Sequence, residues 1–366
     1  MTTVRLNTSY AQLGTFYAEQ MAIQGVEASM LTHKWQAGDL IAPHSDIDIR
    51  VIRDQAPNSW WEWNERLAAA HHQAVRLDPA HSRLLEHPPG FAFTISELDR
   101  NRVSPAEIST WSLVTGSAVA LQRWKSRAQM MPWSSADEKF YRGILDARIG
   151  GRYQLDNDST DNVHRDLDGY RRHCIAWHYV APCWFAAAAL ATRTRCPGKS
   201  AALTQWHPGE LGSHAEESLR LAATTSDPGP SPAEVLRTAH VTVDAVLRRT
   251  PPPMSLPEAP GTDDAAWTTT AGMLRVRVAR WIYYLNPPPE TATGYLIARE
   301  EKELSSARKT LSRLTEGLSG DDALLAKAMA VLLPPGPTTA GTLRDLLALW
   351  TRHRSVVEDF LSAHSA

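Results

Sequence analysis

The stretch SDIDIRVIRD, residues 45–54, decides how the N-terminal part of this chain is interpreted. Apolar and charged side chains alternate along it with a period of two, which predicts a half-buried β-strand. The apolar face holds Ile47, Ile49 and Val51, and the polar face holds Asp46, Asp48 and Arg50. Two carboxylates on one face repel each other unless a positive charge lies between them.

A divalent cation is one source of that positive charge. Mg²⁺ takes oxygen ligands and is commonly held by one or two carboxylates together with the phosphates of a substrate. Asp46 and Asp48 are therefore candidate metal ligands. The alternative is a solvated polar face with Arg50 as the partner, which is the usual explanation of an isolated Asp-x-Asp pair.

The elements around this strand predict a small α/β unit. Each segment around the strand shows either apolar residues at helical spacing or strand-like alternation, and Ser104-Pro105 marks the start of a helix. The expected helices cover residues 9–26, 58–78 and 104–111, and the expected strands cover 26–33, 45–54, 90–99 and 117–124.

From about residue 132 onward the sequence predicts only helices. They are expected over residues 135–148, 162–180, 183–195, 231–250, 265–285, 294–317, 321–333 and 342–361, with a Pro-rich linker over 250–264. The fold class is α+β: an N-terminal mixed sheet with helices, then all-α domains. The expected domains are an α/β domain over 1–130, a helical acceptor-binding domain over 131–250 and a helical bundle over 265–366.

Composition narrows the classes of partner and location. The chain has 366 residues and a formal net charge of -2, which disfavours nucleic acid and anionic membranes as partners. Three cysteines and no apolar leader at the start predict a cytoplasmic protein without a disulfide framework. The most apolar run, residues 174–192, contains His178 and Pro182 and is interpreted as a buried helix of a soluble protein. The oligomeric state stays open.

The order of these elements resembles a known family of enzymes. Gly38, followed by the Ser45-Asp46-Ile47-Asp48 motif on a strand, resembles the nucleotidyltransferases of the DNA polymerase β type. It looks most like the kanamycin-type aminoglycoside nucleotidyltransferases of bacteria, and the resemblance covers residues 28–54.

The resemblance implies an activity and a set of roles. The reaction would move a nucleoside monophosphate from an NTP, ATP above all, to a hydroxyl of a small-molecule acceptor such as an aminoglycoside or other natural product. Asp46 and Asp48 would bind Mg²⁺ and act in catalysis, Ser45 and Gly38 would shape the turn beneath the triphosphate, and Lys34 would contact a phosphate.

The chain departs from the family in two places. Thr32, His33 and Lys34 stand where the family has a Gly-Ser turn after the first strand. The family also carries a third carboxylate on a later strand, but the middle of residues 90–99 has no acid. Glu97, near the end of that segment, is the candidate for the third catalytic carboxylate.

Two other functions follow from these departures and from the helical part. One is a catalytically degenerate nucleotidyltransferase-like protein that binds a nucleotide or another partner. The other is an RNA-acting helical protein, because Arg172 and His178 loosely resemble the Arg…His signature of the HEPN ribonucleases.

Overall fold

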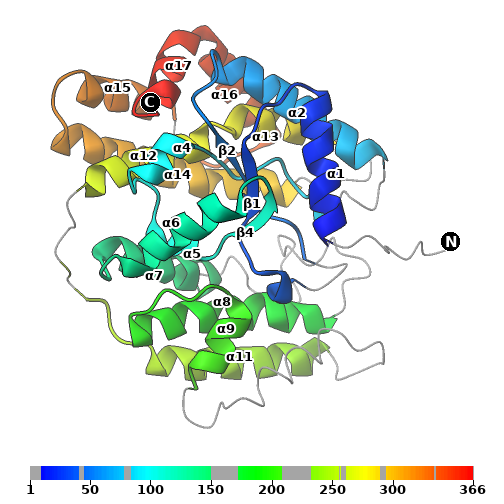
Figure 1. The fold of residues 1–366 in the computed structure, drawn as a ribbon, viewed down its shortest axis with the longest axis vertical. Helices are drawn as coiled ribbons and strands as arrows, with labels where there is room; N and C mark the ends of the chain where they lie inside the picture. Colours follow the sequence, from blue (N-terminus) through cyan, green and yellow to red (C-terminus); the bar gives the residue numbers. More distant parts are fainter. Residues whose placement is uncertain are drawn as a thin grey trace.

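The N-terminal part of the chain folds into a four-stranded mixed sheet covered by helices (Figure 1). The computed structural model describes residues 10–40, 45–77, 84–149, 172–207, 232–254, 256, 261–288, 294–333 and 335–365. The strands are β1 (Met30–His33), β2 (Ile49–Arg53), β3 (Phe91–Thr94) and β4 (Ser112–Thr115). Their order in the sheet is β3-β2-β1-β4, with β2 and β3 parallel and the other pairs antiparallel. The α+β class predicted from the sequence is confirmed at this level.

Strand β2 is buried on both faces, although the sequence predicted a half-buried strand. Ile49 and Val51 face one hydrophobic core, as expected from the alternation, and Ile52 faces a second core on the other side. Arg50 is also buried, because a helix covers its face of the sheet and supplies Glu107 as a partner. Ile47, just before the strand, joins Ile49 and Val51 in the first core.

Helices flank this sheet on both sides. In the N-terminal part they are α1 (Tyr10–Ile23), the 3-10 helix η1 (Ala37–Asp39), α2 (Trp60–Leu77), α4 (Ile95–Asp99), α5 (Pro105–Ser109) and α6 (Ala118–Met130). Helix α5 begins after Ser104 with Pro105 at its first turn, as the sequence predicted.

One predicted strand is shorter than expected, and another is a helix. The strand expected over 90–99 ends at Thr94, because the Thr94 side chain accepts from the backbone of Glu97 and the Glu97 side chain accepts from the backbone of Thr94. This capping box starts helix α4. The strand expected over 117–124 is helix α6, whose first turn Ser117 caps by accepting from the Ala120 amide.

The middle of the chain forms a helical layer with its own core. It contains α7 (Ser135–Ile149), α8 (Arg172–Thr192), α9 (Lys199–Gln205) and α11 (Pro232–Arg249). Helix α8 runs through Pro182 where the sequence predicted a break between two helices. Its residues 180–190 are buried, which confirms the interpretation of the apolar run as a buried helix. None of the helices in the described part of the chain is long and apolar enough to cross a membrane.

The last part of the chain is helical, and it packs against the sheet and α2. Its helices are α12 (Thr262–Leu274), α13 (Arg277–Leu285), α14 (Gly294–Gly317), α15 (Gly320–Val331), α16 (Ala340–Arg352) and α17 (Arg354–Ser362). Two helices predicted as continuous are split, at Val276 and at His353, where the backbone has ψ of 1° and 30° and leaves helical geometry.

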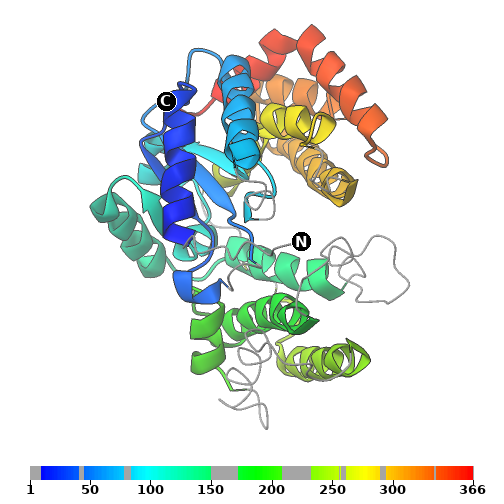
Figure 2. The same cartoon turned by 90° about the vertical axis from the view of Figure 1, so that its right-hand side faces the viewer.

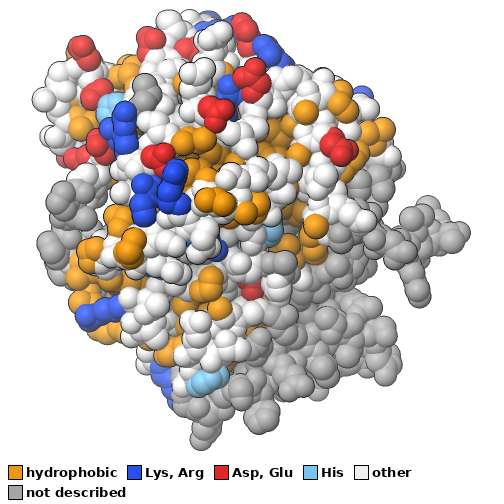
Figure 3. All heavy atoms as spheres, in the orientation of Figure 1, with side chains coloured by type: hydrophobic (Ala, Val, Ile, Leu, Met, Phe, Trp, Pro, Cys, Tyr) orange, Lys and Arg blue, Asp and Glu red, His pale blue; other side chains and the backbone are white. Residues whose placement is uncertain are grey.

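The sheet lies between the two helical groups. Figures 1 and 2 show α8, α9 and α11 on one side of the molecule and α12 to α17 on the other. One continuous hydrophobic core joins α1, α2 and the sheet to the C-terminal helices. On the face seen in Figure 3, acidic and basic side chains are interspersed, in keeping with the formal net charge of -2.

Candidate metal centre

Asp46, Asp48 and His87 meet at one edge of the sheet. Parallel strands start at the same edge, and β2 pairs with β3 so that Arg50 lies opposite Phe91. The two aspartates lie just before β2, and His87 lies just before β3. One possible ligand atom from each of the three residues lies within 4.8 Å of the other two.

Backbone contacts hold the two segments in this position. The amide of Ile47 donates to the carbonyl of Leu84 at 2.9 Å, and the amide of Gly90 donates to the carbonyl of Ile49 at 2.9 Å. The Ile47 side chain is buried in the core. Because side chains alternate along an extended segment, the carboxylates on either side of Ile47 point away from the core and toward the same place.

Asp48 is an ionised carboxylate at the centre of the group. Its side chain is 33% exposed, and one oxygen lies 4.0 Å from Arg50 Nη1 and 3.7 Å from His87 Nε2. Its carbonyl accepts a hydrogen bond from the backbone amide of Lys34 at 3.1 Å. Partial burial acts to raise the pKa of Asp48, but the positive charges around it, Arg50 foremost, hold that pKa below its usual range. The charged form that a metal requires is therefore the form present at neutral pH.

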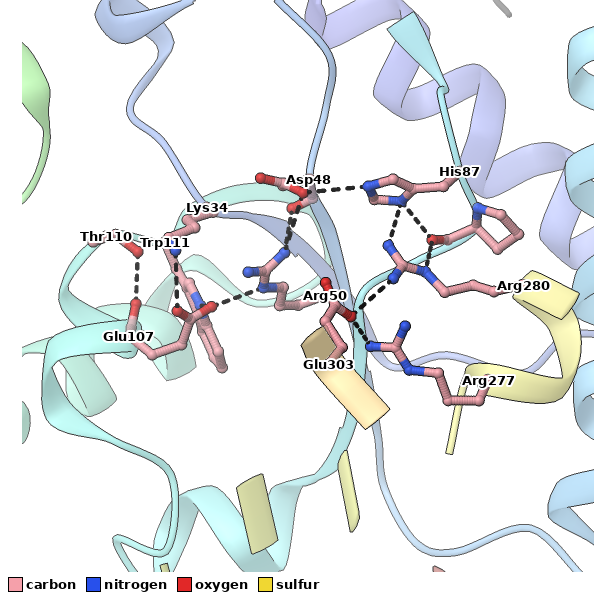
Figure 4. Close-up of polar contacts among 11 residues, drawn as sticks. Lys34, Asp48, Arg50, His87, Glu107, Thr110, Trp111, Arg277, Arg280 and Glu303 are labelled. Carbon is pink, nitrogen blue, oxygen red and sulfur yellow. Dashed lines mark hydrogen bonds and ion pairs between the residues drawn. The ribbon is translucent and has the colours of Figure 1, made fainter. Parts of the chain in front are cut away.

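Arg50 has a closer partner than Asp48 (Figure 4). Its Nε donates to Glu107 Oε1 at 2.8 Å, and its guanidinium lies 5.1 Å from the ring centroid of Phe91. Glu107 also accepts from Trp111 Nε1 at 3.2 Å. Although burial acts to raise the pKa of Glu107, Arg50 and the other donors lower it. Glu107 is thus the closest charged partner of Arg50, and Asp48 lies farther away at 4.0 Å.

His87 is buried, with 3% of its side chain exposed, and it presents Nε2 to Asp48. Its Nδ1 lies 2.9 Å from the carbonyl oxygen of Pro88 and 2.7 Å from Arg280 Nη2. Burial and then the charge of Arg280 lower the pKa of His87 to about 3, although Asp48 acts in the opposite direction. The imidazole is therefore neutral at physiological pH, as metal ligation requires.

Sequence reasoning missed His87. The residue lies outside any regular element and carries no spacing motif to either aspartate. One signal was present: it directly precedes Pro88-Pro89 and the next strand. If that strand is taken as the parallel neighbour of β2, the segments before both strands must converge at one edge of the sheet.

Three predicted phosphate-binding residues lie in the segment between β1 and β2. Lys34 Nζ is 3.8 Å from Glu107 Oε2 and 5.2 Å from the ring centroid of Phe140. Ser45 is buried, and its carbonyl accepts from the Tyr10 hydroxyl at 2.9 Å. Gly38 lies in η1, where its carbonyl accepts from the Ser200 hydroxyl at 3.3 Å. Each residue thus has a defined structural contact, and Lys34 adds positive charge near Asp48.

Glu97 is engaged elsewhere and does not belong to the ligand group. Its two carboxylate oxygens each accept from Arg275 at 2.8 Å, and both side chains are 0% exposed. One of these oxygens also accepts from the amide of Thr94 at 2.8 Å. The third acid expected on the later strand lies instead in helix α4, inside a buried ion pair.

The residues that replace the expected Gly-Ser turn are inside the fold. Thr32 and His33 belong to β1 and are 0% and 8% exposed. Burial lowers the pKa of His33 to about 4, so its ring is neutral at pH 7. The other predicted pair, Arg172 and His178, lies on α8, and its side chains fall outside the described residues.

The donor set fits a divalent cation. Two carboxylates and a neutral imidazole are all metal ligands, and one possible ligand atom from each lies within 4.8 Å of the other two. No family model, curated protein or solved structure matches this chain.

Proposed function

We propose that this chain is a divalent-metal-dependent nucleotidyltransferase. It would transfer a nucleoside monophosphate from an NTP, with ATP implied by the family resemblance, to a hydroxyl of a small-molecule acceptor of the aminoglycoside or natural-product type. The observation that carries the proposal is the pair Asp46 and Asp48, converging just before a central strand in a group of metal-ligand atoms within 4.8 Å. The order α1, β1, η1, β2 that leads to this pair supports the same conclusion.

The residues of the site have distinct roles in this proposal. Asp46 and Asp48 bind the cation that accompanies the triphosphate; when bound, such a cation neutralises phosphate charge and aligns the leaving pyrophosphate. Lys34 provides a positive charge close to Asp48, suited to a phosphate oxygen. Ser45 and Gly38 lie in the segment between β1 and β2, where each carbonyl accepts a hydroxyl hydrogen bond, and they would shape the turn beneath the triphosphate.

A second candidate function is nucleotide binding without transfer. The specific observation in its favour is that Thr32 and His33 fill buried positions in β1 where the family resemblance expects a Gly-Ser turn. A side chain at such a position occupies space that a glycine leaves open for phosphate next to the backbone. This candidate predicts nucleotide binding that does not depend on a metal.

Calorimetry with a panel of NTPs, with and without Mg²⁺, separates the two candidates. The transferase predicts NTP binding that requires the metal and becomes at least tenfold weaker in Asp46→Asn, because one ligand carboxylate is lost. Asp54→Asn is the matched control, because Asp54 is an exposed aspartate just beyond the other end of β2.

Pyrophosphate release in the presence of an aminoglycoside panel then tests transfer itself. Release that depends on both acceptor and metal, and that is lost in Asp46→Asn but kept in Asp54→Asn, supports the transferase. NTP binding that is equally strong without metal and in both variants supports the non-catalytic candidate instead.

A further inference from the structure

The Nε2 atom of His87 faces the carboxylate of Asp48. The His87 side chain is only 3% exposed, and the contact of Nε2 is with Asp48 Oδ1 at 3.7 Å, beyond hydrogen-bond distance. Figure 4 shows the ring pointing from its own loop toward Asp48. A cation between this imidazole nitrogen and the two carboxylates would have ligand atoms from all three residues within 4.8 Å of one another.

We infer that His87 is the third protein ligand of this centre, and that the Asp46-Asp48-His87 set binds a first-row transition-metal dication of the Mn²⁺ type in preference to Mg²⁺. The inference rests on the proposed function only in that both assign Asp46 and Asp48 to a metal. It goes beyond that function because it names a nitrogen ligand and, through it, the class of ion.

The chemistry of the ligands gives the direction of this preference. Mg²⁺ is a hard ion that selects oxygen ligands and keeps several waters. Imidazole nitrogen suits first-row transition metals, whereas carboxylate oxygen suits Mg²⁺ and Mn²⁺ alike, so a mixed set of these ligands favours a transition-metal dication over Mg²⁺. A nitrogen ligand from His87 therefore weakens the case for Mg²⁺ and strengthens the case for a transition-metal ion such as Mn²⁺.

The distances allow this coordination without movement of the backbone. Neighbouring ligand atoms around an octahedral ion are about 3 Å apart when each metal–ligand bond is a little over 2 Å. Asp48 Oδ1 and His87 Nε2 are 3.7 Å apart, and all three ligand atoms lie within 4.8 Å. The two aspartates are partly exposed, and coordination of one ion by all three residues would require their side chains to rotate.

The contacts of His87 Nδ1 define a metal-free and a metal-bound form. Arg280 can only donate, so its contact at 2.7 Å requires Nδ1 to accept, which places the ring proton on Nε2. The carbonyl of Pro88 can only accept, so its contact at 2.9 Å requires Nδ1 to carry the proton, which frees the Nε2 lone pair. Ligation selects the second form, as is usual for metal-bound histidines.

Arg280 is therefore a positioning residue that opposes metal binding. In the metal-bound form it no longer donates to His87, but it still has carboxylate partners: Glu303 at 3.4 Å and Glu300 at 3.7 Å. Replacing Arg280 with glutamine removes the obligatory donor, and its amide oxygen can accept from Nδ1. We expect Arg280→Gln to tighten Mn²⁺ binding about threefold or more.

Electron paramagnetic resonance with Mn²⁺ alone, on the full chain, tests the ligand directly. We expect a nitrogen hyperfine coupling in the wild type and its loss in His87→Gln, with Mn²⁺ affinity falling about 10- to 100-fold and Mg²⁺ affinity changing less than about twofold. His353→Gln is the control, because His353 is exposed between α16 and α17. The wild type should bind Mn²⁺ at least about tenfold more tightly than Mg²⁺.

Several outcomes would overturn the inference. They are a nitrogen coupling that survives in His87→Gln, no coupling in the wild type, or equal affinities of the wild type for Mn²⁺ and Mg²⁺. Circular dichroism shows whether His87→Gln folds. If it does not, the inference is still tested by three measurements: the wild-type nitrogen coupling, the wild-type ratio of Mn²⁺ to Mg²⁺ affinity, and the Mn²⁺ affinity of Arg280→Gln. An affinity for Mn²⁺ that is unchanged or lower in Arg280→Gln would contradict the proposed role of Arg280.

The metal assays are independent of nucleotide transfer. Nitrogen-coupled Mn²⁺ binding in a protein that releases no pyrophosphate would refute the transferase and leave this inference standing. Acceptor-dependent transfer with Mg²⁺ and no nitrogen coupling to Mn²⁺ would refute the inference and leave the transferase standing.

Discussion

At the scale of single residues, buried arginines hold two glutamates in structural ion pairs. Arg50 pairs with Glu107, and Arg275 pairs with Glu97. A guanidinium stays charged and has five donors, so inside a protein it requires carboxylate or carbonyl acceptors. Glu97 and Glu107 are therefore held by structural partners. Asp46 and Asp48 lie in a group of possible metal-ligand atoms, with Asp48 4.0 Å from Arg50.

The first prediction concerns the pair of Glu97 and Arg275. Glu97→Gln should lower the free energy of unfolding by about 3 kcal/mol or more, because it leaves the charge of a fully buried guanidinium uncompensated. Urea denaturation measures the loss, and Glu19→Gln on the exposed face of α1 is the control. The folded Glu97→Gln protein should keep its affinity for Mn²⁺. A loss below about 0.5 kcal/mol would mean that the pair does not stabilise the fold.

At the scale of elements, one helix is capped by a residue next to it in the sequence and another by a residue far away in the sequence. The cap that ends β3 and starts α4 lies within four consecutive residues, from Thr94 to Glu97. The start of α9 is capped by Asp39, a residue from η1 about 160 positions earlier. Its carboxylate accepts from the amides of Lys199 and Ser200 at 2.9 and 2.8 Å and from the Ser200 hydroxyl at 2.8 Å. This contact joins the sheet region to the middle helices.

The second prediction tests that distant cap. Asp39→Ala should cost about 2 kcal/mol of unfolding free energy, because three hydrogen bonds to a buried carboxylate are lost. Asp39→Asn keeps one acceptor oxygen and should cost less. Gly198→Ala should also destabilise, since an added Cβ would collide with the Asp39 carboxylate. Thermal unfolding of the three variants gives the ranking, and equal stability of Asp39→Ala and the wild type would refute the role of the cap.

At the scale of the whole molecule, the N-terminal and C-terminal parts of the chain pack against each other and share hydrogen bonds. Glu358 of α17 accepts from the amides of Trp60 and Trp61 at 2.8 and 2.9 Å, so it caps the start of α2. After α17, the carbonyl of Ser365 accepts a hydrogen bond from the hydroxyl of Thr94 at 3.0 Å. The apolar faces of α2 and of the C-terminal helices lie in one core.

The third prediction follows from this shared core. The segment 1–130, expected from the sequence to be a domain, should not fold alone, because the side of α2 that packs on α13 and α17 would be exposed to water. Proton–nitrogen correlation spectra and near-ultraviolet circular dichroism of the isolated segment measure this directly. We expect poor dispersion and weak aromatic signals. A well-dispersed spectrum with a cooperative melt would show that the N-terminal unit is autonomous.

Short-range patterns account for what the sequence by itself determined. The alternation around Ile47, Ile49 and Val51, the Ser104-Pro105 helix start and the apolar run of α8 depend on residues close in the chain, and all three are found in the structure. The convergence of Asp46 and Asp48 on one side was visible for the same reason. Side chains two positions apart in an extended segment point the same way, whatever packs around them.

Only the tertiary structure decided which distant groups meet. The parallel pairing of β2 with β3 brings His87 to Asp48, and the burial of α4 brings Glu97 to Arg275, 178 residues away in the sequence. These contacts depend on strand order and helix packing, which are set by the burial of apolar surface summed over the whole chain. Because this burial depends on many residues at once, the sequence next to either partner does not reveal the contact. The third metal ligand and the structural role of Glu97 therefore become apparent only once the chain is folded.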